Sequence, residues 1–101
     1  MFTRTEASQR ARLSLEGLSV GDAFGETNIA ATPAVRLRIE QRLLDARRPW
    51  RWTDDTAMAI AIVETLDAHG EVDEDALAAA FAARYALEPV RGYGAGAHRI
   101  L

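Results

Sequence analysis

Apolar residues recur at helical spacing along much of this chain, most clearly in residues 53–70. The apolar positions of that stretch are Met58, Ile62, Val63 and Leu66. Thr53 or Asp54 is expected to cap the helix, because both residue types favour N-caps and acids occupy the first turn. Gly70 after His69 is a typical helix stop. The pattern therefore predicts a helix that begins directly at the motif TDDT.

A first helix is expected from about Glu6 to Ala23, with Thr5 as a candidate cap. Three glycines, Gly17, Gly21 and Gly25, follow one another at intervals of four, which places them on nearly one face. Each interior glycine costs about 1 kcal/mol relative to alanine. The stripe indicates close approach by another backbone or by a ligand, with chance and helix fraying as the alternatives.

Two further helices and a glycine-rich loop complete the predicted elements. A second helix is expected over Ala34–Ala46, where apolar residues alternate imperfectly with arginines before Pro49. A fourth begins after the cap Asp73, and its apolar interior ALAAAFAARYAL predicts a largely buried helix. Residues 91–96, RGYGAG, form the expected loop, and AHRIL resembles the beginning of another helix.

Composition supports a globular, all-α chain, and its length fits one domain of modest size. The 101 residues are 49% hydrophobic and 27% charged, and helix-forming residues predominate. A net charge of −3 provides no general attraction to nucleic acid or membranes. The absence of cysteine excludes disulfides, thiolate ligands and a cysteine nucleophile. Without a membrane-spanning run or the apolar segment of a signal peptide, a cytoplasmic location is expected.

The motif TDDT has two interpretations. In the first, its threonine and aspartates simply cap a helix and complement the positive helix end. In the second, Thr53, Asp54 and Asp55 offer three oxygen ligands within one turn, which suits Mg²⁺ or Mn²⁺. Three ligands do not complete an octahedral shell, so water, substrate or other segments would have to supply the rest.

The other candidate features also have structural explanations. The glycines of RGYGAG allow a backbone to approach a phosphate or sugar, or they form a tight turn. Trp50 and Trp52 are interpreted as packing residues, with a wall for a ring-shaped ligand as the alternative. Ser14 and Ser19 lack a visible base, which gives nucleophilic hydrolysis no support.

Three stretches together resemble the N-terminal part of the ADP-ribosylglycohydrolases. They are GLSVGDAFG at 17–25, WTDDTAMA at 52–59 and RGYGAG at 91–96, and they occur in the family's order and approximate spacing. The resemblance implies an all-α fold, here a partial orthogonal helical bundle, with a pair of bound divalent ions. It also implies hydrolysis of the glycosidic bond between ADP-ribose and a protein side chain or small acceptor.

The resemblance assigns roles to particular residues. Thr53, Asp54 and Asp55 would be metal ligands for Mg²⁺ or Mn²⁺, and Gly92 and Gly94 would lie in a loop that approaches the ADP-ribose. Many family members carry a glutamate above the metals, at the position of Ile29 in this chain. The nearest acid is Glu26, which is the candidate catalytic residue if the loop is differently shaped.

A second departure concerns length. Family members are expected to be about three times as long, with a further Asp-x-Asp-Ser/Thr metal cluster near the C-terminus. This chain has no aspartate after Asp75, so it holds half of the ligand set and is expected to be inactive alone. Residues 1–101 are therefore expected to be an incomplete N-terminal segment of the family's domain: a fragment, a truncated gene product or one piece of a split protein. A partial bundle would expose apolar surface and favour self-association or a complementing chain. The alternative is a small helical interaction module that kept the scaffold without the chemistry.

Overall fold

The computed structural model describes residues 2–101 of the chain. Over this span the chain forms five helices and no strand, which confirms the predicted all-α class. The helices are α1 (Arg4–Thr27), α2 (Pro33–Gln41), α3 (Asp54–His69), α4 (Glu74–Leu87) and α5 (Ala95–Ile100). Over the same span no helix is both long and apolar enough to cross a membrane.

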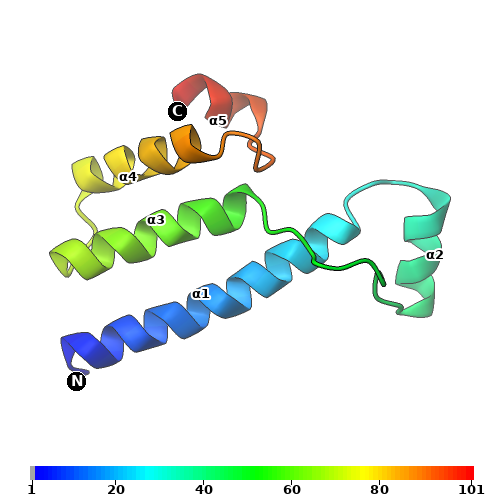
Figure 1. Ribbon diagram of the computed structural model, residues 1–101, viewed down its shortest axis with the longest axis horizontal. Helices are drawn as coiled ribbons and strands as arrows, with labels where there is room; N and C mark the ends of the chain where they lie inside the picture. Colours follow the sequence, from blue (N-terminus) through cyan, green and yellow to red (C-terminus); the bar gives the residue numbers. More distant parts are fainter. Residues whose placement is uncertain (1) are drawn as a thin grey trace.

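The helices form a flat layer (Figure 1). α3 lies between α1 and α4, and these three helices run side by side in alternating directions. α2 stands apart beyond the C-terminal end of α1, and α5 lies beside α4. The molecule measures 46 × 36 × 18 Å, and because a helix is about 10–12 Å across, 18 Å holds little more than one layer. The all-α architecture that the resemblance implied is therefore present as one layer of antiparallel helices, with α2 apart from it.

Small residues on α3 let its two neighbours approach closely. Ala57 and Ala61 are 1% and 0% exposed, and Thr56 and Thr65 are buried beside them. Thr65 satisfies its hydroxyl within the helix by donating to the carbonyl of Ala61 at 2.8 Å. The core of the layer is therefore made of alanine and threonine methyl groups along α3.

Polar contacts join α1 to α3 at both ends of the helix pair. At the end near the N-terminus of α1, Ser8 Oγ donates to Asp67 Oδ1 at 2.6 Å. Arg4 donates to the carbonyl of Asp67 at 2.7 Å, and Arg12 forms an ion pair with its carboxylate. At the opposite end, the carboxylate of Asp22 holds the beginning of α3. These contacts fix the register of the two helices, and with it the position of TDDT relative to α1.

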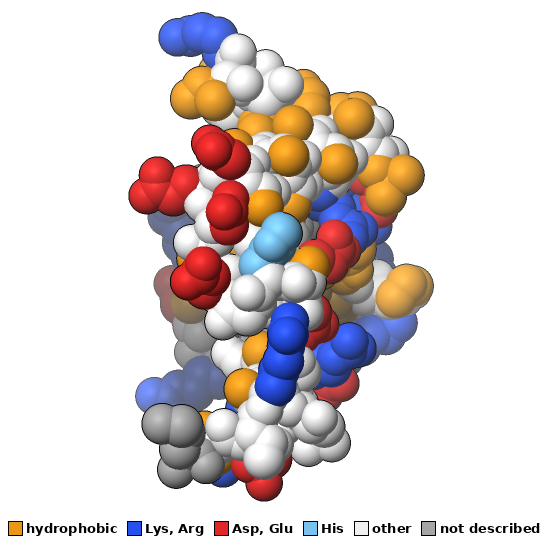
Figure 2. Space-filling view, turned by 90° about the vertical axis from the view of Figure 1, so that its left-hand side faces the viewer, with side chains coloured by type: hydrophobic (Ala, Val, Ile, Leu, Met, Phe, Trp, Pro, Cys, Tyr) orange, Lys and Arg blue, Asp and Glu red, His pale blue; other side chains and the backbone are white. Residues whose placement is uncertain are grey.

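The expected burial of α4 is wrong, because none of its residues is buried. α4 packs on α3 along one side, and near its C-terminal end Tyr85 contacts His98 of the short helix α5. Its other faces, including Leu87 at 68% exposure, are open, and Figure 2 shows apolar side chains gathered on the upper part of the molecule, where α4 and α5 lie. Composition predicted an apolar helix correctly but not how many neighbours it has.

The first helix begins earlier and ends later than predicted. Its cap is Thr3 instead of Thr5, and the Thr3 hydroxyl accepts from Glu6 N–H while the Glu6 carboxylate accepts from Thr3 N–H. This reciprocal pair is a capping box, which stabilises the first turn. The helix continues to Thr27, so the glycines within it do not cause fraying.

The second helix ends five residues before the predicted Ala46. Its cap Thr32 and Pro33 start it one residue early, and Arg42 ends it by adopting the left-handed conformation with φ 57°. Beyond it, the buried carboxylate of Asp45 accepts from the backbone and side chain of Arg47. This local turn replaces the last helical turn that the sequence suggested.

Candidate functional site

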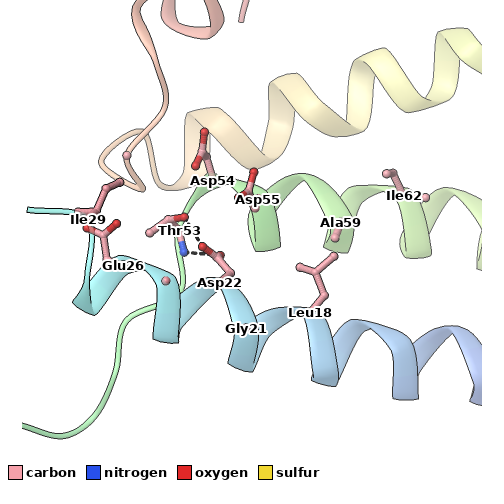
Figure 3. Close-up of a pocket in the computed structure, with 12 residues that line it drawn as sticks. Leu18, Gly21, Asp22, Glu26, Ile29, Thr53, Asp54, Asp55, Ala59 and Ile62 are labelled. Atoms are coloured by element: carbon pink, nitrogen blue, oxygen red, sulfur yellow. Dashed lines mark hydrogen bonds between the residues drawn. The ribbon is translucent and has the colours of Figure 1, made fainter. Parts of the chain in front are cut away.

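A cleft of about 770 Å³ opens between the C-terminal half of α1 and the first turns of α3 (Figure 3). Three segments that are distant in sequence meet there: α1, the TDDT turn and the RGYGAG loop. Its lining residues are Leu18, Gly21, Asp22, Gly25, Glu26, Ile29, Thr53, Asp54, Asp55, Ala59, Ile62 and Gly92. The cleft is the candidate site because it gathers most of the residues singled out in the sequence.

The three TDDT residues with candidate roles line this cleft. Thr53 is the N-cap residue of α3 with extended backbone, and Asp54 and Asp55 are the first two helical residues. Thr53 is 8% exposed, whereas Asp55 is open to solvent. The turn thus places a buried hydroxyl beside one half-buried carboxylate, that of Asp54, and one exposed carboxylate, that of Asp55.

Of the remaining predicted site residues, Glu26 and Gly92 line the cleft and Gly94 does not. Glu26 lies near the C-terminal end of α1, next to Ile29, which also faces the cleft (Figure 3). Gly92 has φ +86°, and a Cβ placed on it would lie 3.7 Å from Thr53 Cβ. Gly94 is instead the N-cap residue of α5.

Sequence reasoning missed Asp22, which lies at the centre of the site. Its Oδ2 accepts from Thr53 N–H at 2.7 Å and from Thr56 N–H at 3.2 Å. The Thr53 hydroxyl donates to Oδ1 at 2.5 Å, and the Thr56 hydroxyl donates to Oδ2 at 2.6 Å. The available signal was its place in GLSVGDAFG, four residues before Glu26 and therefore on the same helix face.

The expectation that Thr53 or Asp54 caps α3 with its own side chain is wrong. Thr53 occupies the N-cap position but makes no side-chain cap hydrogen bond. The N–H of Thr56, which an N-cap side chain would ordinarily bind, donates to Asp22 instead. A carboxylate on α1 therefore caps α3 from outside, which frees the Thr53 side chain from that role.

The hydrogen bonds at Asp22 outweigh the effect of its burial. Burial raises the pKa of the Asp22 carboxyl, but the hydrogen bonds from Thr53 and Thr56 lower it by more, so the pKa lies below its ordinary value of 3.8. Asp22 is therefore a carboxylate at neutral pH. Nearby, burial raises the pKa of Tyr93, as does the negative charge of Asp54.

The cleft is strongly negative. Its twelve lining residues include four carboxylates, those of Asp22, Glu26, Asp54 and Asp55, and no arginine or histidine. Carboxylates and hydroxyls are the ligands that hard divalent cations prefer. The lining favours a cation over an anion.

The glycine stripe of α1 is not a backbone contact within the described residues. A Cβ added at Gly17, Gly21 or Gly25 would meet no atom within 4 Å, so the predicted close approach by another backbone is wrong for residues 2–101. Gly21 and Gly25 line the cleft, while Gly17 does not. The two glycines leave the part of that wall beside Asp22 and Glu26 without side chains.

The tryptophans hold the surrounding loops and stay out of the cleft. Trp50 packs at 5.8 Å from the Phe24 ring, and the Arg48 guanidinium stacks on it. The Arg91 guanidinium lies over the ring of Trp52. The interpretation of both tryptophans as packing residues accounts for these contacts.

The residues present fit a hard divalent ion in kind. The hydrogen of the Thr53 hydroxyl is committed to Asp22, so its oxygen has lone pairs available as a ligand, beside the carboxylates of Asp54 and Asp55. Within residues 2–101, no group of three or more Asp, Glu, His or Cys side chains is close enough to hold a metal by itself. The donor set is therefore of the right chemistry and only part of a shell.

Comparison with known proteins identifies the relatives of this chain. The ADP-ribosylglycohydrolase family model matches residues 3–101. The human protein named ADP-ribosylhydrolase ARH3 is 53% identical over 45 residues, which are 45% of this chain and 12% of that protein. The ADP-ribosylarginine hydrolase Tri1 of Pseudomonas putida is 33% identical over 104 residues, 98% of this chain and 25% of that protein.

The matched segments are short relative to those proteins. The chain spans between 12% and 25% of the length of the curated relatives described above. No solved structure gave a significant match. Because the family model covers nearly the whole chain, and the motifs that carry the resemblance meet at one cleft, this chain belongs to the ADP-ribosylglycohydrolase family.

Proposed function

We propose that this chain supplies one wall of the active site of a divalent-metal-dependent hydrolase. The reaction would be cleavage of the glycosidic bond between ADP-ribose and a protein side chain or a small acceptor. The observation that carries the proposal is the meeting of Glu26, Thr53–Asp55 and Gly92 at one cleft. Family membership supports the reaction class.

The residues that line the cleft would have three separate roles in this reaction. Thr53, Asp54 and Asp55 would hold Mg²⁺ or Mn²⁺, which supplies Lewis-acid polarisation and an activated water when bound. The carboxylate of Glu26, on the α1 side of the cleft, would accept a proton from the attacking water. Gly92 leaves the loop backbone uncovered where the substrate would approach.

The negative charge of the cleft supports the proposal that a divalent cation lies between the protein and the substrate. ADP-ribose carries a negatively charged diphosphate, and four carboxylates without a basic side chain among the lining residues would repel it. Divalent ions on the same carboxylates would remove that repulsion. The anionic lining is therefore understandable if the site works in a metal-loaded state.

A chimaera tests this function. In it, the chain replaces the matched segment of the Pseudomonas putida relative, whose name describes an ADP-ribosylarginine hydrolase. We expect the folded chimaera to release ADP-ribose from ADP-ribosylarginine in the presence of Mn²⁺, and Asp54→Asn or Asp55→Asn to abolish turnover. The chain alone is expected to show no turnover, because it offers only part of a metal shell.

Asp75→Asn is the matched control. Asp75 is the second residue of α4, as Asp55 is of α3, but it lies outside the cleft. It should leave turnover intact. Normal turnover in a chimaera that lacks both Asp54 and Asp55 would contradict the proposal.

No three acidic side chains within residues 2–101 lie close enough together to hold a metal ion by themselves, which favours one alternative, a non-catalytic helical interaction module. Such a module would fold stably, bind neither Mn²⁺ nor ADP-ribose, and give an inactive chimaera that is nevertheless folded. Calorimetric titration of the chain with each ligand separates the two functions.

A further inference from the structure

Asp22 binds two threonines of the next-but-one helix with a single carboxylate. It accepts four hydrogen bonds, two from backbone N–H groups and two from hydroxyls, all from Thr53 and Thr56. Three of the four are 2.7 Å or shorter. Bonds of this length to an ionised acceptor are strong and strongly directional.

The bond from the Thr53 hydroxyl determines which way that hydroxyl faces. A threonine hydroxyl has one hydrogen and two lone pairs. The Thr53 hydroxyl hydrogen points at Asp22 Oδ1, and the two oxygens are 2.5 Å apart. Any other group that contacts the Thr53 hydroxyl oxygen must therefore donate a hydrogen bond to it or be a cation. Thr53 lines the cleft, and Figure 3 shows Asp22 directed at it from α1.

We propose that Asp22 is a positioning residue that fixes the Thr53 side chain in one rotamer with its oxygen available to a divalent cation. The proposal rests on the proposed function, since it concerns the same cleft. Asp22 acts through Thr53 and through the first turn of α3, whose N–H groups it also holds. Residues of this kind typically change metal affinity by roughly 10- to 100-fold when mutated.

Asparagine at position 22 gives a specific test, because it has nearly the same shape but a different polarity. Its amide nitrogen can only donate, so it cannot accept from both hydroxyls as the carboxylate does. At least one threonine hydroxyl must turn its hydrogen elsewhere. For Thr53 the open direction is the cleft, where a hydrogen opposes a cation.

The first measurement is the affinity of the chain for Mn²⁺ alone, by calorimetric titration. Asp22→Asn and Thr53→Val should each weaken binding by roughly 10-fold or more. The double variant should be no weaker than Thr53→Val, because both changes remove the same oxygen ligand. Thr65→Val, which also removes a buried hydroxyl from α3, should bind Mn²⁺ as the unmodified chain does. Additive effects of the two single changes would overturn the proposal.

The second measurement needs no metal. Three-bond NMR couplings report the side-chain rotamer of Thr53, which should be single in the unmodified chain and averaged in Asp22→Ala. If the alanine variant does not fold, Asp22→Ser serves, because its shorter side chain cannot span both threonines. An unchanged single rotamer in the folded variant overturns the proposal, whatever Mn²⁺ does. If the unmodified chain binds no Mn²⁺ but Asp22→Ala shows an averaged Thr53 rotamer, the metal dependence in the proposed function is contradicted. The role of Asp22 in positioning Thr53 is then still supported.

Discussion

The guanidinium carbon of Arg91 lies 3.4 Å from the centre of the Trp52 ring, and Arg91 Nη1 donates to the Trp52 carbonyl at 3.0 Å. Its Nη2 also pairs with Glu88 at 2.8 Å. One side chain thereby ties the loop that holds Gly92 to the segment that leads into TDDT. The relationship explains how two motifs about forty residues apart reach the same cleft.

Arg91→Ala should lower the free energy of unfolding by about 1–3 kcal/mol, because it removes the stacking on Trp52 and a part-buried charged hydrogen bond. Arg91→Lys should recover little of the lost stability, because an ammonium group cannot stack on the ring and form paired hydrogen bonds as a guanidinium does. Urea denaturation followed by circular dichroism measures both. Arg99→Ala, on an exposed part of α5, is the control and should change little.

Gly92→Ala should destabilise the fold by about 1–2 kcal/mol, because an L-residue is strained at a φ of +86°. Space is not the cause, since the nearest atom to the new methyl lies 3.7 Å away. Gly96→Ala is the matched change within α5, where nothing lies within 4 Å and φ is ordinary. Thermal denaturation that found the two variants equally stable would contradict the assignment of strain to Gly92.

Local sequence signals correctly predicted where α3 ends and where α4 begins. Gly70 ends α3 with φ 74°, and Asp73 caps α4 by accepting from Ala76 N–H, as expected from residue type alone. The end of α2 was missed because Arg42 adopts a left-handed conformation that arginine rarely takes. No short-range sequence pattern predicts the left-handed conformation of Arg42.

The candidate site was predicted where a local motif marks it and was missed where it depends on contacts between α1 and α3. The TDDT residues carry a recognisable motif, and Glu26 was the nearest acid to the family's position. The contact of Asp22 with α3 could not be predicted, because its partners lie 31 and 34 positions away and hydrogen bonds across that separation depend on how α1 packs on α3. The prediction that α4 is buried was wrong for the same reason, because the number of helices that pack around α4 depends on the tertiary structure.

Asp45 should make stability fall in acid. The hydrogen bonds from Arg47 lower the pKa of its carboxyl from 3.8 to about 2. The folded state therefore binds a proton less readily than the unfolded state, so this contribution is present above about pH 4 and is lost as pH falls toward 2. The lowered pKa of Asp22 acts in the same direction.

Asp45→Asn isolates this contribution. The variant should be less stable than the unmodified chain at neutral pH and should lose less stability between about pH 4 and about pH 2. Urea denaturation at a series of pH values gives the slope of the free energy of unfolding against pH for the variant and for the unmodified chain. Equal slopes would show that Asp45 has the same proton affinity in both states.

Ala61→Leu should destabilise the layer by about 1–3 kcal/mol or more, because Ala61 is 0% exposed and a larger side chain forces helices apart. Ala79→Leu, at an exposed position of α4, adds the same volume without overpacking and should have little effect. Denaturant midpoints of the two variants compare them directly. A tolerated Ala61→Leu would mean that α3 does not pack as closely as described.

The external cap of α3 has a consequence for the order in which the molecule assembles. An isolated helix with this sequence would begin at TDDT without an acceptor for its first N–H groups, because that acceptor belongs to α1. The first turn of α3 is therefore completed only when the two helices dock, and Thr53, Asp54 and Asp55 take up their arrangement in the same event. Conditions that loosen this docking should dismantle the candidate site while most of the helical content persists.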